Sequence, residues 1–177
     1  ISQYVWARED FEYYIEKAEK FIPERISGDY VRNAEDQNSV NGFIITLKAE
    51  ECMCSAISYK LTGEHKYAEK CAALMRILYK EYPDRNQAST QALVQEGHFF
   101  QQMAIAADLI WDEGFLTPED KAGLEKTFRV FMDIVDKELY LGGISNRYLA
   151  EIVGCLTAAM VLQDGERMQR FVYGHSG

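Results

Sequence analysis

The chain has 177 residues, which is enough for one sizeable hydrophobic core but too few for two ordinary domains. We therefore expect a single domain over residues 1–177. Hydrophobic residues make up 47% and charged residues 27%, a balance typical of globular rather than disordered chains. The net charge of −9 disfavours nucleic acid and anionic lipid as partners. No stretch approaches the roughly 20 apolar residues that span a bilayer, so we expect no membrane partner.

Apolar residues recur with helical spacing along most of the chain, and the alternation typical of strands is nearly absent. Start and stop signals agree with this pattern. Thr117 and Asp164 supply capping oxygens, Pro83 ends a helix, and Gly174 suits a helix C-terminus. In chain order, the expected helices cover about residues 7–21, 43–61, 65–82, 95–112, 118–135, 146–162 and 165–173. The sequence therefore predicts an all-α domain.

These helices form an internal repeat of helical hairpins, which begin near Phe43, Gln95 and Asn146. In the last two hairpins an apolar first helix precedes a second helix that is apolar on one side only. This contrast predicts an inner layer of first helices and an outer layer of second helices. On the first helix of the first hairpin, Ser55 and Ser58 continue a polar face. An open solenoid scaffold would also explain the repeat, but the variable hairpin lengths favour a curved or closed α/α array.

The sequence lacks the familiar signatures of nucleotide and metal sites. It contains no glycine-rich phosphate loop, no HExxH, no calcium loop and no GxSxG. Its cysteines form no CxxC pair, and Cys52 and Cys54 would diverge by about 200° on a helix. Buried free thiols are therefore the favoured interpretation. We expect neither a metal nor a cofactor.

Polar residues cluster at the beginnings of two helices that should be buried. In a curved double layer these beginnings open on one rim, so the two clusters could line a common cleft. Helix N-termini also favour an anionic ligand there. The first cluster comprises Gln95, Glu96, His98, Gln101 and Gln102. The second comprises Ser145, Asn146, Arg147, Tyr148 and Glu151.

Each of these residues also has a purely structural interpretation. Asn146 suits a helix cap, and His98 could be a partly buried histidine that is satisfied by a backbone carbonyl. Arg147 and Glu151 are four residues apart, which is typical of an ion pair on a helix surface. Tyr148 could be a core aromatic residue with a solvated hydroxyl. No single residue in the two clusters identifies a function.

Several stretches in the second half of the chain resemble the α/α-toroid domain of the heparinase II/III-like and alginate-lyase polysaccharide lyases. The resemblance spans about residues 43–177, and an Asn that opens a buried helix before a Gly-rich exit is its most specific part. The stretches that carry it are Leu61–Lys70, Ala106–Trp111, Leu116–Asp120, Ile144–Tyr148, Gln163–Gly165 and Tyr173–Gly177.

The resemblance implies β-elimination on a uronic-acid-containing polysaccharide and a periplasmic or secreted location. The family uses an Asn to neutralise the sugar carboxylate and a Tyr or His as base and acid. On this chain these roles imply Asn146, Tyr148 and His98 as catalytic residues. The residues implied in substrate binding are Arg147, Glu151, Gln95 and Gln102.

Two departures from the family pattern affect this interpretation. Arg147 stands where many relatives have His or Trp, although its planar fork could clamp a carboxylate or sulfate. The family's Tyr lies in a later hairpin, and three hairpins are fewer than the family toroid uses. We therefore expect a fragment whose partners are the remaining domains of the same polypeptide, or else an incomplete relative. An α/α-toroid glycoside hydrolase with Glu96 and Glu151 as its carboxylates is one alternative, and a non-catalytic helical scaffold that binds glycan or protein is another.

Overall fold

The computed structural model describes residues 4–21, 40–81, 90–139 and 146–174. Every regular element in these ranges is an α-helix, which confirms the predicted all-α class. Most helix boundaries agree with the sequence pattern to within four residues. The helix expected over 95–112 begins at Thr90, so the polar cluster of Gln95–Gln102 lies inside this helix rather than at its beginning. The helices are α1 (Val5–Lys20), α3 (Val40–Thr62), α4 (His65–Glu81), α5 (Thr90–Ile110), α6 (Pro118–Leu139), α7 (Asn146–Val161) and α8 (Gly165–Tyr173).

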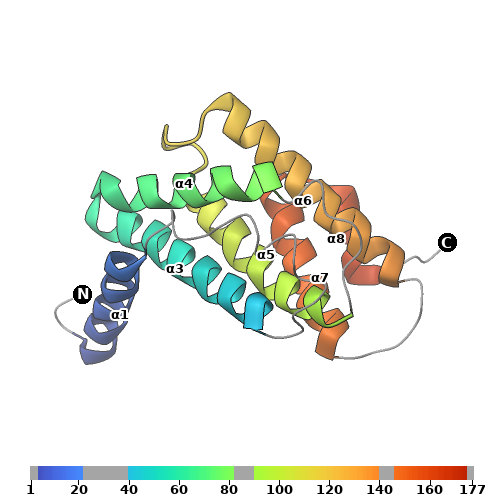
Figure 1. Ribbon diagram of the computed structural model, residues 1–177, viewed down its shortest axis with the longest axis horizontal. Helices are drawn as coiled ribbons and strands as arrows, with labels where there is room; N and C mark the ends of the chain where they lie inside the picture. Colours follow the sequence, from blue (N-terminus) through green and yellow to red (C-terminus); the bar gives the residue numbers. More distant parts are fainter. Residues whose placement is uncertain (1–3, 22–39, 82–89, 140–145, 175–177) are drawn as a thin grey trace.

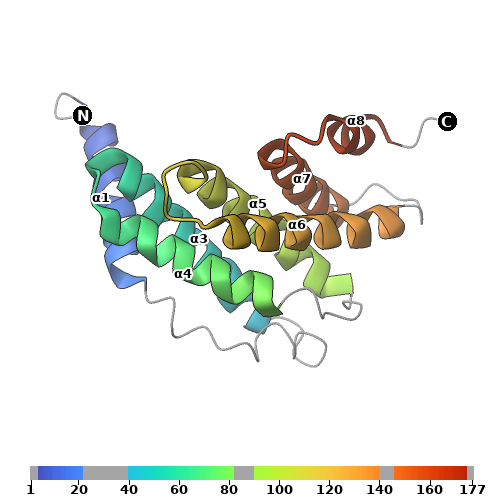
Figure 2. The ribbon, with the colours of Figure 1, turned by 90° about the horizontal axis from the view of Figure 1, so that it is seen from above.

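The described helices form three consecutive hairpins, α3–α4, α5–α6 and α7–α8 (Figure 1). The first helices of the hairpins lie side by side and run in the same general direction, with α5 packed between α3 and α7. The return helices α4 and α6 pack against each other over this row. Figure 2 shows the same arrangement from above. The chain therefore has the layered arrangement that the alternation of apolar and one-sided helices predicts.

Local signals in the sequence explain where two of the helices begin. The backbone N–H of Asp120 donates to Thr117 Oγ1 at 3.1 Å, and the N–H of Thr117 donates back to Asp120 Oδ2 at 3.0 Å. This reciprocal capping box satisfies two donors that the first turn of α6 leaves open. At α8, Asp164 Oδ1 accepts from the N–H of Arg167 at 3.1 Å. Both caps confirm the start signals predicted from the sequence.

The core is built where the apolar faces of the hairpins meet. Phe100 on α5 stacks on Phe131 of α6, with ring centroids 4.1 Å apart, and meets Phe128 edge-on at 6.0 Å. Leu124 and Val135 extend the same face of α6 and are fully buried. Aromatic pairs of this kind add to the free energy gained from burying their apolar area. The one-sided apolar pattern predicted for α6 is therefore confirmed.

Helix α3 differs from the prediction on one side. Ser55 and Ser58, which were expected on a polar surface, are both fully buried. Helix α3 packs against α1, α4 and α5, so its contacts reach around to the face that these serines occupy. Small side chains leave space for neighbouring helices to come close. The predicted polar face is therefore wrong at these two positions.

The cysteines follow the prediction. Cys52, Cys54, Cys71 and Cys155 are all buried and none forms a disulfide. The thiol of Cys71 donates to the carbonyl oxygen of Cys52 at 3.1 Å, which ties α4 to α3. Burial raises the pKa of Cys155 and of Cys52 well above the usual range. These thiols act as small apolar side chains of the core.

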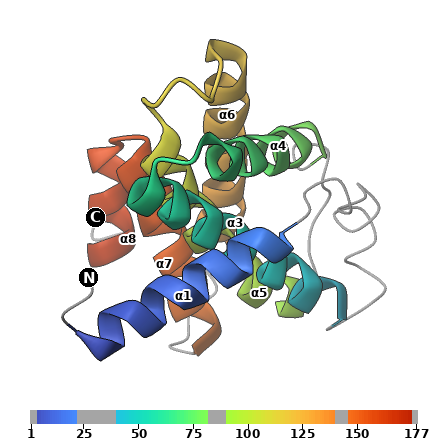
Figure 3. The same cartoon turned by 90° about the vertical axis from the view of Figure 1, so that its left-hand side faces the viewer.

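Helix α1 crosses α3, as the view from the end of the molecule shows (Figure 3). Its C-terminal end is joined to the first turns of α4 by hydrogen bonds. Glu19 accepts hydrogen bonds from Tyr67 Oη and Lys66 Nζ, each at 2.7 Å, and Lys70 Nζ donates to the carbonyl oxygen of Ala18 at 2.7 Å. Three side chains of α4 therefore hold one side chain and one main-chain group of α1.

A second polar anchor joins the outer helices α4 and α6. Asp120 is almost fully buried, and its carboxylate accepts hydrogen bonds from Arg76 Nη2 at 2.8 Å and Arg76 Nε at 3.1 Å. Tyr79 Oη donates to the same carboxylate at 3.1 Å. Burial raises the pKa of Asp120, but hydrogen bonds from Arg76, Thr117 and Tyr79 outweigh it and lower this pKa to about 2. The capping residue of α6 thus also holds α4 in place.

Candidate functional site

The first helices of the last two hairpins touch through their backbones at Gly97 on α5 and Gly154 on α7. A Cβ on Gly97 would lie 2.4 Å from the carbonyl oxygen of Ala150, and a Cβ on Gly154 would lie 2.5 Å from the carbonyl oxygen of Gly97. Real Cβ atoms do not approach other atoms so closely, so only glycine fits at these two positions. The contact brings together the two segments in which the sequence places its polar clusters.

Two carboxylates lie beside this crossing, one on each helix. Glu96 precedes Gly97 and is 8% exposed, while Glu151 is fully buried next to Ala150. A buried carboxylate carries a large desolvation cost that its surroundings must offset. The expected position of Glu151 on the helix surface is therefore wrong. The carboxylates belong to the packed interior of the hairpin array rather than to an open surface.

The other predicted site residues differ in how far their side chains are buried. His98 on α5 is exposed, whereas Gln102 on the same helix and Tyr148 on α7 are half-buried. The Oε1 atom of Gln102 is buried and accepts no hydrogen bond from the residues that the structure describes. Asn146 is the first residue of α7, as expected for a residue that opens a buried helix. The side chains of Asn146, Arg147 and Gln95 lie outside the described part of the structure.

His98 and Gln102 are four residues apart, so they occupy the same face of α5. Gln101, which is also half-buried, and Asp108, which is exposed, extend this polar side along the helix. The half-buried Ile105 and Leu109 lie on the same side of α5, so the face that other helices leave uncovered mixes polar and apolar side chains. Its polar side chains can donate and accept hydrogen bonds, as a hydroxyl-rich ligand requires.

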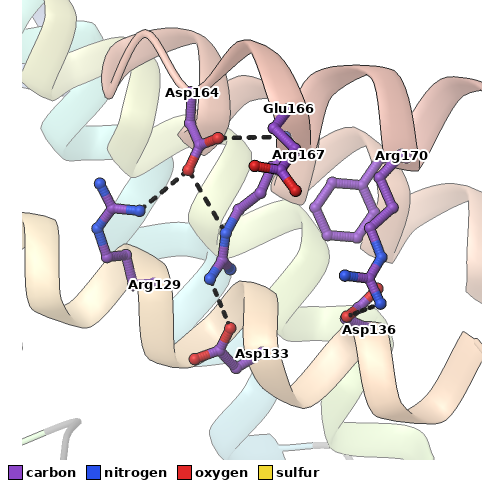
Figure 4. A pocket seen from close by; sticks show the side chains of 8 residues that line it. Arg129, Asp133, Asp136, Asp164, Glu166, Arg167 and Arg170 are labelled. Carbon is purple, nitrogen blue, oxygen red and sulfur yellow. Dashed lines mark hydrogen bonds and ion pairs between the residues drawn. The ribbon is translucent and has the colours of Figure 1, made fainter.

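Helices α6 and α8 face each other across a polar hollow of about 290 Å³ (Figure 4). Asp164 Oδ2 lies 3.0 Å from Arg129 Nη1 and 3.5 Å from Arg167 Nε. Arg167 Nη2 also meets Asp133 Oδ1 at 2.7 Å. Hydrogen bonds from Arg129 to Glu125 and Asp164 raise the pKa of that arginine. The residues that line the hollow are Arg129, Asp133, Asp136, Asp164, Glu166, Arg167, Arg170 and Phe171.

The arginines of this hollow are already engaged by carboxylates. Arg170 Nη2 lies 2.7 Å from Asp136 Oδ2, which completes a row of ion pairs between the two helices. An anion would have to displace a carboxylate in order to bind there. The cluster therefore fastens α8 to α6 and is not a prepared anion site. Sequence reasoning missed it, although Arg129, Asp133 and Asp136 recur at helical spacing on α6.

Other kinds of site find no support in the described residues. No group of three or more His, Cys, Asp or Glu side chains among them is arranged to hold a metal ion. None of the described helices combines the length and apolar content needed to cross a membrane. The chain matches no family model, no curated protein and no solved structure. The crossing of α5 and α7, with the adjoining polar side chains of α5, is therefore the candidate functional site.

Proposed function

We propose that this chain is part of the α/α toroid of a polysaccharide lyase, which binds a uronic-acid-containing polysaccharide and cleaves it by β-elimination. The observation that carries the proposal is the backbone contact between Gly97 and Ala150. It makes the first halves of α5 (Thr90–Ile110) and α7 (Asn146–Val161) neighbours, as a shared substrate cleft requires. The sequence resemblance of about residues 43–177 to lyase toroids points to the same class of reaction.

The proposed chemistry needs three groups around one sugar unit. A base removes the proton on the carbon beside the sugar carboxylate, and the electron pair left behind forms a carbon–carbon double bond. The glycosidic oxygen on the next carbon departs with the electrons of its bond and takes up a proton from an acid. Because negative charge builds on the carboxylate, a nearby hydrogen-bond donor lowers the barrier.

We assign the carboxylate-neutralising role to Asn146. Its position as the first residue of α7 supports this role, because the free N–H groups of a helix start and a side-chain amide both favour an anion. Tyr148, two residues further along α7, and the exposed His98 on α5 are the proposed proton carriers. Arg147, Gln95 and Gln102 complete the proposed set as substrate-binding residues, and the fully buried Glu151, expected to bind substrate, is left a supporting role in the interior.

Burial of the carboxylates weakens the glycoside hydrolase alternative. A hydrolase needs two carboxyl groups that flank the glycosidic bond and reach it from the cleft. Glu96 and Glu151 are 8% and 0% exposed, so neither is available to a polysaccharide in this arrangement. Elimination is therefore better supported than hydrolysis.

The proposal includes the setting of the domain. Its partners are an acidic polysaccharide or oligosaccharide and the remaining domains of the same polypeptide. Its location is periplasmic or secreted, because such polymers occur outside the cytoplasm. Helix closure into a ring belongs to the proposal as well, supported by the layered row of α3, α5 and α7.

A substrate screen tests the proposal. The complete polypeptide is incubated with alginate, pectate, hyaluronate, chondroitin sulfate and heparan sulfate while ultraviolet absorbance and reducing ends are both recorded. A lyase raises both signals together, because each cleavage creates one unsaturated end and one reducing end. Reducing ends without absorbance would replace elimination by hydrolysis. Binding without either signal would replace catalysis by a scaffold role.

A further inference from the structure

Helix α7 carries an apolar stripe that no described part of the chain covers. Leu149, Val153 and Met160 are 59%, 39% and 64% exposed, and Leu156 between them is partly exposed. At about 100° per residue these four side chains fall within about 60° of one another on the helix. The stripe lies opposite the fully buried Ala158 and the other buried residues of α7.

The exposed face of α7 differs from that of the other first helix beside it. Helix α5 is covered on two sides by α3 and α7, and the face that it leaves open carries His98, Gln101 and Gln102 beside Ile105. Helix α7 packs against α5, α6 and α8, and the face that it leaves open bears no charged side chain between Ile152 and Gln163. A helix that is apolar nearly all round is normally buried.

Repeat proteins end in capping units whose outer face is polar. The hairpin α7–α8 does not meet that condition, because α7 bears the apolar stripe and α8 also exposes Val172 and Tyr173, at 58% and 77%. We infer that the stripe on α7 is the docking surface for a further helical hairpin of the same polypeptide. The first, apolar helix of that hairpin packs on α7 as α7 packs on α5.

Continuity with the α5–α7 interface favours this occupant over a second copy of the chain. A helix of 16 residues is about 24 Å long. Contact along one side of such a helix, about 10 Å wide, buries far less than the ~800 Å² per partner of a stable dimer. A hairpin covalently joined to α8 does not need that area, because linkage gives it a high effective concentration. The inference rests on the helical array of the proposed function but not on its chemistry.

Cysteine accessibility tests the inference, because the four native cysteines are all buried and give little background. Met160→Cys places a thiol on the stripe, and Lys126→Cys places one on the exposed surface of α6 as a matched control. Both variants are made in the 177-residue chain and in the complete polypeptide. Each is then labelled with a water-soluble maleimide under native conditions.

We expect both thiols to react at similar rates in the 177-residue chain. In the complete polypeptide, the thiol of Met160→Cys should react at least about tenfold more slowly, while the thiol of Lys126→Cys keeps its rate. Val153→Cys repeats the measurement at a second position. Equal labelling of the stripe in both polypeptides would overturn the inference. Protection in the 177-residue chain that increases with protein concentration would also overturn it, because that result identifies a second copy of the chain as the occupant. Lyase activity does not enter this readout, so the two proposals fail separately.

Discussion

Gly154 on α7 packs so closely against Gly97 on α5 that a Cβ on Gly154 would lie 2.5 Å from the carbonyl oxygen of Gly97. Alanine at a helix interior normally stabilises by about 1 kcal/mol relative to glycine. Here the neighbour is backbone, which cannot rotate away, so the steric cost outweighs the gain in helix propensity. The closeness of these two glycines sets the distance between α5 and α7 and thereby the geometry of the candidate site.

We predict that Gly97→Ala and Gly154→Ala each lower the free energy of unfolding by about 1–3 kcal/mol. Urea denaturation followed by circular dichroism measures the effect. Gly165→Ala on α8 is the control, because a Cβ there meets nothing within 4 Å. Its stability should stay unchanged or rise slightly. If all three variants behave alike, the backbone contact between α5 and α7 is not as close as described.

The carboxylate of Asp120 should make stability depend on pH in the acid range. Its folded pKa of about 2 lies below the ordinary value of 3.8, so it stabilises the fold above pH 3.8. That contribution is lost as the pH falls from 3.8 towards 2, where the folded state takes up the proton as well. We expect up to about 2 kcal/mol from this group.

Asp120→Asn isolates this effect. The difference in unfolding free energy between the original chain and the variant should be largest near neutral pH and should shrink between pH 4 and pH 2. Urea titrations at several pH values within that window provide the measurement. A difference that stays constant over the whole window would show that Arg76 and Tyr79 do not hold the carboxylate in its ionised form.

Removing the Asp164 side chain should loosen α8. This residue caps the helix at the N–H of Arg167 and also pairs with Arg129. We predict that Asp164→Ala costs about 1–2 kcal/mol, mostly from the cap, because partly exposed ion pairs contribute little. Hydrogen exchange of α8 should be faster in the variant than in the original chain, whereas exchange of α5 should not change. Gln169→Ala, at an exposed position of α8, should leave exchange unchanged.

The thiols should be unreactive until the chain unfolds. Burial, with a smaller contribution from Glu50, raises the pKa of Cys54 to about 12, so little thiolate is present at neutral pH. We predict that a disulfide reagent detects no rapidly reacting thiol in the native chain and four in denaturant. A fast-reacting thiol in the native state would contradict the burial of the cysteines and would also remove the background on which the labelling experiment depends.

The sequence predicts the helices well because their limits depend on local chemistry. Thr117 and Asp164 begin helices through contacts within three residues, and Gly174 ends α8 with a φ of 75°. Periodicity of apolar residues likewise identifies the buried face of α6. These signals need no knowledge of the partner helix, so they can be read from the chain alone.

The site was only partly predictable because it depends on which helix faces which. Ser55 was expected on a surface but is buried, since residue polarity alone does not reveal how many helices surround α3. Glu151 was open to a surface interpretation for the same reason. Gly97 and Gly154 carried a usable signal, because glycines inside otherwise apolar helices often mark close approach of two backbones.

The most direct test of the proposed function compares elimination by the complete polypeptide with that of its Asn146→Ala variant. On the substrate that the screen identifies, the original polypeptide should generate the absorbance of the unsaturated product. The variant should be slower by at least about 100-fold, because it lacks the group that neutralises the sugar carboxylate. Gln169→Ala serves as the control and should retain full activity. Unchanged product formation by Asn146→Ala would contradict the proposed site, and the absence of an unsaturated product on every uronate polysaccharide would contradict the proposed reaction.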